Sequence, residues 1–207
     1  MTQSGHRLFA RLYDPMMRQI ETTALGERRA RLLGNLAGEV LEVGAGTGAN
    51  LAHYPSQAAV TLTEPDEAMR AQLHKKIARS GTDVVVHDAA AEDLPYPAAS
   101  FDAVVFTLVL CTVVDPDRAL AEAWRVLRPH GSLIAIEHVR GSGGLARWQR
   151  IVDPLWTRLQ AGCHVHRDTA AAVTRAGFIT DRRHPFRVMP TAIPASPMIE
   201  IVARRPG

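Results

Sequence analysis

The feature that most constrains the fold is a glycine-rich loop directly after a short apolar segment. Residues 40–43 are Val-Leu-Glu-Val, and Gly44, Gly46 and Gly48 follow in alternation with small residues. Glycine has no Cβ, so it can turn the backbone tightly and let N–H groups face a ligand. A strand that ends in such a loop is typical of a cofactor site in an α/β fold. The loop alone also fits a nicotinamide dinucleotide, because Gly44, Gly46 and Ala49 satisfy the Gly-x-Gly-x-x-Gly or Ala spacing.

The rest of the chain alternates predicted strands with predicted helices. Short apolar segments bounded by turn residues predict strands, and apolar residues at helical spacing predict helices. The predicted strands are residues 39–43, 59–63, 83–87, 101–106, 132–137, 178–181 and 198–203, and the predicted helices are residues 50–54, 66–79, 115–127 and 167–176. This order implies a doubly wound, Rossmann-like α/β fold with a mostly parallel seven-stranded sheet. Its ligand is expected beyond the carboxyl ends of the strands.

The length of 207 residues fits a single domain. Its expected parts are an N-terminal helical collar (1–38), a cofactor-binding core (39–139), a substrate lid (140–177) and the final strands (178–207).

Composition narrows the classes of function. The longest apolar run, residues 103–114, is too short to span a bilayer, and the first residues lack the charged-then-apolar order of a secretory signal. We therefore expect no membrane span and a cytoplasmic location. The net charge of +3 comes from scattered arginines such as Arg28, Arg29 and Arg31, which predict solvated faces and no nucleic-acid partner. An arginine face that meets an anionic substrate or lipid surface is the alternative.

The two cysteines, Cys111 and Cys163, are expected to be reduced thiols. Cys163, His164 and His166 stand in one run, which invites interpretation as a metal site. Two or three ligands without a second cluster fall short of a tetrahedral site, so no metal is expected.

Two carboxylates bear on the choice of cofactor. Glu64 stands twenty residues after Gly44, at the predicted end of the second strand, where a carboxylate can accept hydrogen bonds from both hydroxyls of a ribose. Glu42 stands two residues before the first glycine, where its charge would repel a pyrophosphate and attract a cationic amino group. These positions favour a cationic cofactor over a dinucleotide.

Several motifs in order resemble the class I S-adenosylmethionine-dependent methyltransferases. They are residues 40–48, Glu64, the Ala-Glu-Asp-Leu-Pro run at 91–95, Ser-Phe-Asp at 100–102 and Leu-Arg-Pro at 127–129. The resemblance covers roughly residues 40–139 and implies S-adenosylmethionine as the cofactor.

A further resemblance extends to methyltransferase-like proteins that methylate alkyl thiols. It rests on residues 46–50, 54–55, 107–111, 137–139, 148–149, 153–156, 162–163 and Arg167. It implies a small-molecule acceptor, with a thiol favoured over a phospholipid or another N- or O-nucleophile. The animal relatives carry an apolar N-terminal anchor that this sequence lacks, so their location is not carried over. A non-enzymatic cofactor-binding protein is the remaining rival, and the oligomeric state is left open.

The cofactor site implied by the resemblance consists mainly of residues at or just after the ends of the predicted strands. Its residues are Tyr13, Glu42, Gly44, Ala45, Gly46, Gly48, Asn50, Glu64, Pro65, Met69, Ala90, Ala91, Glu92, Thr107 and Leu108. Ala90 departs from the family pattern, because many members have an aspartate there that holds the adenine amino group. We expect the backbone N–H groups of Ala91 and Glu92 to take over that contact, with Pro65 and Met69 on the adenine faces.

The expected acceptor site is lined by Cys111, His138, Trp148, Trp156 and Arg167. The methyl group of a sulfonium is already activated, so the protein mainly has to align the acceptor and exclude water. His138 is the candidate catalytic residue, as a general base or a polar substrate contact. The alternative is a role in capping the fifth strand by a hydrogen bond. For Cys111 a buried apolar side chain is the commoner fate, and both tryptophans can instead form the core of the lid.

Overall fold

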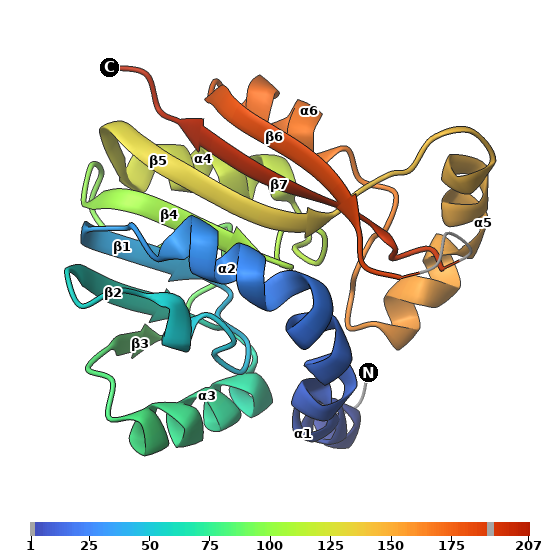
Figure 1. Cartoon of the computed structure of the whole chain (residues 1–207), viewed down its shortest axis with the longest axis horizontal. Helices are drawn as coiled ribbons and strands as arrows, with labels where there is room; N and C mark the ends of the chain where they lie inside the picture. The colour runs from blue at the N-terminus through green and yellow to red at the C-terminus, as the bar shows by residue number, and fades with distance from the viewer. Residues whose placement is uncertain (1–2, 190–192) are drawn as a thin grey trace.

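The computed structural model describes residues 3–189 and 193–207 and contains a seven-stranded sheet in the order β3-β2-β1-β4-β5-β7-β6 (Figure 1). Strands β1 to β5 are parallel, and β7 is antiparallel to both β5 and β6. The strand bounds are β1 Gly38–Val43, β2 Ala58–Thr63, β3 Val85–His87, β4 Phe101–Thr107, β5 Leu127–His138, β6 Ile179–Arg187 and β7 Pro197–Arg204. The predicted doubly wound, mostly parallel seven-stranded fold is confirmed.

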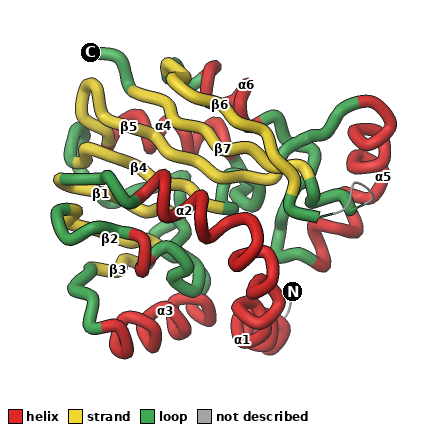
Figure 2. Tube along the Cα trace, viewed as in Figure 1, coloured by secondary structure: helices red, strands yellow, loops and turns green. Residues whose placement is uncertain are grey.

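Helices cover both faces of the sheet (Figure 2). Their bounds are α1 Gln3–Ile20, the π-helical turn η1 Glu21–Leu25, α2 Gly26–Leu33, the 3₁₀ turn η2 Leu51–His53, α3 Glu67–Ser80, α4 Pro116–Val126, α5 Gly143–Leu159 and α6 Thr169–Arg175. One core cluster includes Leu33 of α2 and Leu73 of α3, and the other includes Leu120 of α4 and Val173 of α6. The two clusters pack on opposite faces of the central strands.

Aspartates begin several of these helices where the sequence predicts helix starts. The Asp66 carboxylate accepts a hydrogen bond from Met69 N at 2.9 Å, and Asp115 accepts one from Arg118 N at 3.0 Å. Such caps satisfy N–H groups that have no partner in the first helical turn. They fix where α3 and α4 begin, and therefore where the loops that precede them must lie.

Four elements differ from the sequence-based expectation. Strand β5 is twelve residues long instead of the predicted six, and it begins at Leu127, directly after α4. Residues 50–54 form only a 3₁₀ turn, because Pro55 follows and the Asn50 side chain is held in buried hydrogen bonds. Strand β6 is nine residues long instead of four, and its side chains are mostly exposed, so it lacks the apolar alternation that reveals a strand. Helix α5 was not predicted as a helix, since glycines stand at its start and Pro154 stands inside it.

Helix α5 lies at the end of the molecule, beyond the strand ends (Figure 1). It carries exposed apolar side chains, among them Ile151, Leu155 and Leu159. Among the described residues, none of the helices combines the length and the apolar character needed to span a membrane.

Candidate active site

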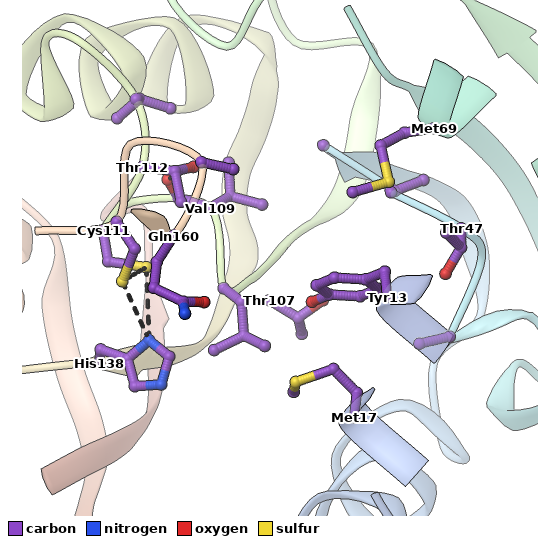
Figure 3. A pocket seen from close by; sticks show the side chains of 18 of the residues that line it. Tyr13, Met17, Thr47, Met69, Thr107, Val109, Cys111, Thr112, His138 and Gln160 are labelled. Carbon is purple, nitrogen blue, oxygen red and sulfur yellow. Dashed lines mark hydrogen bonds between the residues drawn. The ribbon is translucent and has the colours of Figure 1, made fainter. Parts of the chain in front are cut away.

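A cavity of about 670 Å³ opens beyond the carboxyl ends of the parallel strands. One part, here called the cofactor half, is formed by the glycine loop, residues 64–69 and residues 90–92. The other part, the acceptor half, is formed by Cys111, His138, and lining residues between 156 and 163 and between 188 and 198. Figure 3 shows Thr47, Met69 and Tyr13 on one side of Thr107, and Cys111, Gln160 and His138 on the other.

The glycine loop adopts left-handed backbone conformations, with φ of 67° at Gly44, 57° at Gly46 and 81° at Gly48. A Cβ on Gly44 would lie 2.7 Å from a methyl carbon of Val109, so the loop leaves no room for a side chain there. Gly44, Ala45 and Gly46 line the cavity as predicted positions of the cofactor loop. Gly48 does not line it, and packs instead against Leu51 and Leu73.

Glu64 fastens the glycine loop to the end of β2. Its Oε2 accepts a hydrogen bond from Gly46 N at 2.7 Å, and its Oε1 accepts one from Asp66 N at 2.9 Å. Burial raises the pKa of the carboxyl, although both backbone hydrogen bonds oppose this shift. Each oxygen keeps a lone pair that can accept a further hydrogen bond from a ligand in the cavity.

The remaining predicted adenine contacts also line the cofactor half: Pro65, Met69, Ala90, Ala91 and Glu92. Asp88, the acidic residue nearest to Ala90 on its N-terminal side, points elsewhere and pairs with Arg70 at 2.9 Å. Asp88 therefore does not replace the missing aspartate at position 90 as an adenine contact.

Glu42 lies at the floor of the cavity and is buried. Asn50 Nδ2 donates to its Oε1 at 2.9 Å, and the Tyr54 hydroxyl donates to its Oε2 at 2.8 Å. Burial raises the pKa of Glu42 to about 7 in spite of these donors. Asn50 itself does not line the cavity, which corrects its expected place as a cofactor contact. It lies behind Glu42 and holds it in place.

The N-terminal helices reach into the site. Tyr13 lines the cavity as expected, and burial raises its pKa well above the usual value. Asp14 Oδ1 lies 2.5 Å from Thr47 Oγ1, so α1 contacts the glycine loop directly.

Arg29 corrects an expectation from the sequence. The sequence predicts a solvated side chain here, yet Arg29 is 2% exposed and lines the cavity. Its guanidinium donates to both carboxylate oxygens of Glu21, at 2.9 and 3.1 Å, and to Asn50 Oδ1 at 2.6 Å. The role becomes visible only in the fold, which brings Arg29 to Glu21 of η1 and to Asn50. The sequence pattern carries no signal for it.

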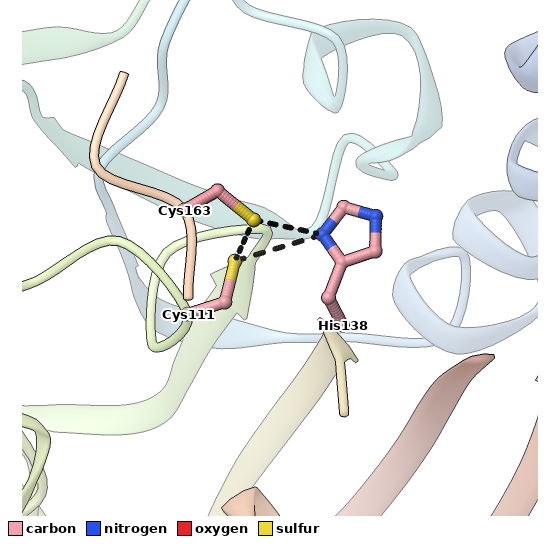
Figure 4. Close-up of side chains that lie close together, drawn as sticks. All are labelled: Cys111, His138 and Cys163. Carbon is pink, nitrogen blue, oxygen red and sulfur yellow. Dashed lines mark hydrogen bonds between the residues drawn. The ribbon is translucent and has the colours of Figure 1, made fainter. Parts of the chain in front are cut away.

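Two thiols and an imidazole meet in the acceptor half (Figure 4). The Sγ atoms of Cys111 and Cys163 are 3.7 Å apart, and His138 Nδ1 lies 3.7 Å from Cys111 Sγ and 3.5 Å from Cys163 Sγ. The Cys111 thiol and the His138 ring lower the pKa of Cys163, whereas the presence of Cys163 and burial raise the pKa of Cys111. One proton is therefore lost from this pair more readily than from an ordinary cysteine.

Glu137 builds the loop that carries Cys111. Its carboxylate accepts hydrogen bonds from Val109 N at 2.9 Å, Leu110 N at 3.0 Å and Cys111 N at 3.1 Å. Leu108, a predicted site residue that lines the cavity with Thr107, has a φ of 62°, and its N–H donates to Ile136 O at 2.8 Å. The end of β5 thus dictates the shape of the loop after β4.

Two residues predicted to contact the acceptor do not line the cavity. Trp148 is 47% exposed on α5, whereas Trp156 of the same helix does line the cavity. Arg167 lies behind the site and donates to Leu110 O at 2.6 Å. The predicted acceptor contacts of Arg167 and Trp148 are therefore wrong. Arg167 supports the loop after β4, and Trp148 faces away from the site.

The run from Cys163 to His166 divides between two clusters. His164 Nδ1 lies 2.8 Å from Asp153 Oδ2, His166 Nδ1 lies 2.9 Å from Asp153 Oδ1, and Val165 N donates to the same carboxylate at 3.1 Å. Cys163 instead faces Cys111. The sequence predicts no further metal ligands beside this run. The structure differs from that expectation, because the fold brings Cys111 and His138 to Cys163 from distant positions in the chain.

Comparison with known proteins agrees with this geometry. The sequence profile of the family described as "Methyltransferase domain" matches residues 41–135. The human thiol S-methyltransferase TMT1A is 40% identical over 146 residues, which are 67% of this chain and 59% of the human protein. The mouse thiol S-methyltransferase TMT1B is 37% identical over 168 residues, which are 76% of this chain and 67% of the mouse protein. The matched part thus spans about three fifths to two thirds of these relatives.

A solved structure of geranyl diphosphate methyltransferase in complex with S-adenosylmethionine has the same fold. Its TM-score is 0.70 at 15% identity, over 88% of this chain and 84% of that chain. The glycine loop, the sheet order and these matches define the class, and the chain belongs to the class I S-adenosylmethionine-dependent methyltransferases. The cofactor of this class is S-adenosylmethionine, and within the class the chain is similar to the thiol S-methyltransferases in particular.

Proposed function

We propose that the chain catalyses methyl transfer from S-adenosylmethionine to the sulfur of a small apolar thiol. The observation that carries the proposal is the chemistry of the acceptor half. Its described lining residues include Met189, Ala195 and Met198, and none of them is Asp, Glu, Lys or Arg. A largely apolar site without these residue types suits an alkyl thiol, because burial of a charged group without a partner is costly.

The cofactor half supports the binding of a cationic nucleoside. Glu42 can pair with the amino group of the methionine moiety, and the Glu64 oxygens can accept hydrogen bonds from the ribose hydroxyls. Bound S-adenosylmethionine supplies a methyl group activated by the sulfonium charge. The residues around it therefore have to orient the acceptor and exclude water, and a weakly acidic thiol needs little help from a base.

A phospholipid N-methyltransferase is the rival activity, suggested by the arginines of the collar and the tail. Two of the collar arginines are engaged within the chain: Arg31 pairs with Glu200 at 2.7 Å, and the Arg28 guanidinium lies 4.0 Å from the centre of the Phe186 ring. The described acceptor half also offers no cationic side chain to a lipid phosphate. The thiol is therefore the better supported acceptor.

The test is a panel of acceptors with purified protein and S-adenosylmethionine. Alkyl thiols, a phenol, an amine and phosphatidylethanolamine vesicles are compared by mass detection of the methylated product and by release of S-adenosylhomocysteine. We expect turnover on thiols that exceeds all other classes. Turnover on phosphatidylethanolamine without turnover on thiols would replace the proposal by its rival, and cofactor binding without any turnover would leave a non-enzymatic role.

A further inference from the structure

The positions of Cys111, His138 and Cys163 match three corners of a tetrahedral metal site. A zinc ion with Zn–S bonds of about 2.3 Å and Zn–N bonds of about 2.0–2.1 Å places two sulfurs about 3.8 Å apart and a sulfur and a nitrogen about 3.5–3.6 Å apart. The corresponding distances here are 3.7 Å between the sulfurs, and 3.7 and 3.5 Å from them to His138 Nδ1. All three atoms are thus already at ligand spacing.

The backbone around the cluster holds these positions. His164 N donates to Cys111 O at 2.7 Å, so the residue after one cysteine is bonded to the other. Cys111 N donates to Glu137 Oε2, and Glu137 is the neighbour of His138. Since each ligand is fixed to the segment that carries another, binding a metal would require little rearrangement.

The ligand set indicates which metal fits and what is left open. Thiolate and imidazole donors select zinc over magnesium or calcium, which prefer oxygen. The cluster has three members among the described His, Cys, Asp and Glu side chains, and all three line the acceptor half. Three protein ligands with a fourth position open to a cavity are the pattern of a catalytic zinc site, whereas structural sites have four protein ligands.

We propose that Cys111, His138 and Cys163 bind a Zn²⁺ ion whose fourth coordination position receives the sulfur of the acceptor thiol. This inference rests on the proposed function. The acceptor thiol loses its proton to solvent when it coordinates the ion, because a metal lowers the pKa of a bound thiol. The thiolate sulfur then forms a bond to the methyl carbon as the bond from that carbon to the sulfonium sulfur breaks, and the electron pair of the broken bond remains on the departing thioether.

The first experiment measures metal binding without turnover. The full chain is reduced, stripped with a chelator and titrated with Zn²⁺ in a calorimeter, and Co²⁺ is added in parallel to detect thiolate-to-cobalt charge-transfer absorption. We expect one equivalent of metal and a clear charge-transfer band. Cys163→Ala and His138→Ala are each expected to weaken Zn²⁺ binding by at least about 100-fold, since even second-shell changes cost 10- to 100-fold. The surface variant His74→Ala is the matched histidine control and should bind like the parent chain.

Other outcomes would overturn the metal site. They are no binding by the reduced chain, binding that persists in Cys163→Ala, or binding lost in His166→Ala, which would place the ion at Asp153. A reduced chain that binds no Zn²⁺ but readily forms a Cys111–Cys163 disulfide under mild oxidant would likewise overturn it and indicate a redox pair.

A second experiment separates this inference from the proposed function. Thiol methylation is measured on the metal-free and the Zn²⁺-loaded chain, with S-adenosylmethionine binding measured on both. We expect metal removal to lower kcat/KM for the thiol by about 10-fold or more, with cofactor affinity unchanged. Full activity of the metal-free chain would overturn the zinc role and leave thiol methylation intact. Tight Zn²⁺ binding without thiol turnover would retain the metal site, overturn its proposed role toward the acceptor and refute the proposed function.

Discussion

Glu42 is a buried carboxyl group that lines the cavity, and we propose that it pairs with the amino group of the cofactor. Burial raises its pKa in the folded protein to about 7, above the value of about 4.3 expected in the unfolded chain. A raised pKa means that its contribution to stability is fully present at low pH and is lost as the pH rises through about 7. In the absence of cofactor, the protein therefore carries a destabilising charge at pH 8.

We expect Glu42→Gln to separate stability from binding. The variant should melt at a higher temperature than the parent at pH 8, with a difference that shrinks toward pH 5. Its affinity for S-adenosylmethionine at pH 8 should fall roughly 10- to 100-fold, the value of a hydrogen bond to a charged group. Differential scanning calorimetry and titration calorimetry measure the two effects, and exposed Glu39→Gln is the control. Equal cofactor affinity in both variants would contradict the role of Glu42.

At the scale of elements, a buried guanidinium links the N-terminal helices to Asn50, just after the glycine loop, in addition to the contact between Asp14 and Thr47. Arg29 of α2 bonds to Glu21 of η1 and to Asn50, and Asn50 in turn bonds to Glu42. The collar is thus continuous with the floor of the cofactor half.

Replacement of Arg29 by methionine keeps the length of the side chain and removes its donors. We expect a loss of about 1–3 kcal/mol in the free energy of unfolding, because the half-buried Glu21 carboxylate and the buried Asn50 Oδ1 lose their charged donor. Cofactor affinity should also fall, because Asn50 loses one of its fixed partners. Urea denaturation and calorimetry measure both, and exposed Arg18→Met is the control. A loss of stability with unchanged cofactor affinity would show that the collar acts on folding alone.

The segment that carries Cys163 is fixed by Asp153 of α5 through Val165, His164 and His166. We expect Asp153→Ala to raise KM for the acceptor several-fold while the Kd for S-adenosylmethionine stays within about two-fold. The loss of a charged hydrogen bond should also cost about 1–3 kcal/mol of stability. Steady-state kinetics and cofactor titration provide the readout, with the exposed ion-pair variant Asp117→Ala as the control. An equal rise in KM for the acceptor and in Kd for S-adenosylmethionine would contradict a role of Asp153 that is confined to the acceptor half.

Local features of the sequence sufficed to predict the strands, the glycine loop and the lining positions Glu42, Glu64 and His138, because each depends on a strand end. Arg29 and Glu137 were missed, since their roles depend on which distant backbone groups the fold brings to them. Trp148 was predicted to contact the acceptor together with Trp156, but the two are eight positions apart on α5. That separation turns them about 80° around a helix, so one faces the cavity and the other faces solvent.

At the scale of the whole molecule, cofactor binding should stabilise the fold by mass action. S-adenosylmethionine at 100 times its Kd adds about 2.7 kcal/mol to the free energy of unfolding. For a domain of this size, that corresponds to a rise in Tm of roughly 5–10 °C. Thermal denaturation with increasing S-adenosylmethionine measures the shift. NAD at the same concentration should leave Tm unchanged, and a shift with NAD alone would return the glycine loop to the dinucleotide class.

The sheet order has a consequence for how the chain is made. Strand β7 is the last strand in chain order, yet it lies between β5 and β6 and pairs with both. During synthesis, one edge of β5 therefore keeps unpaired backbone N–H and C=O groups until Arg204 has left the ribosome. An unpaired apolar edge strand can pair with strands of other chains. A chain that stops before Pro197 should consequently form aggregates during synthesis, visible as loss from the supernatant of a cell-free translation, whereas a chain that stops after Arg204 should remain in solution.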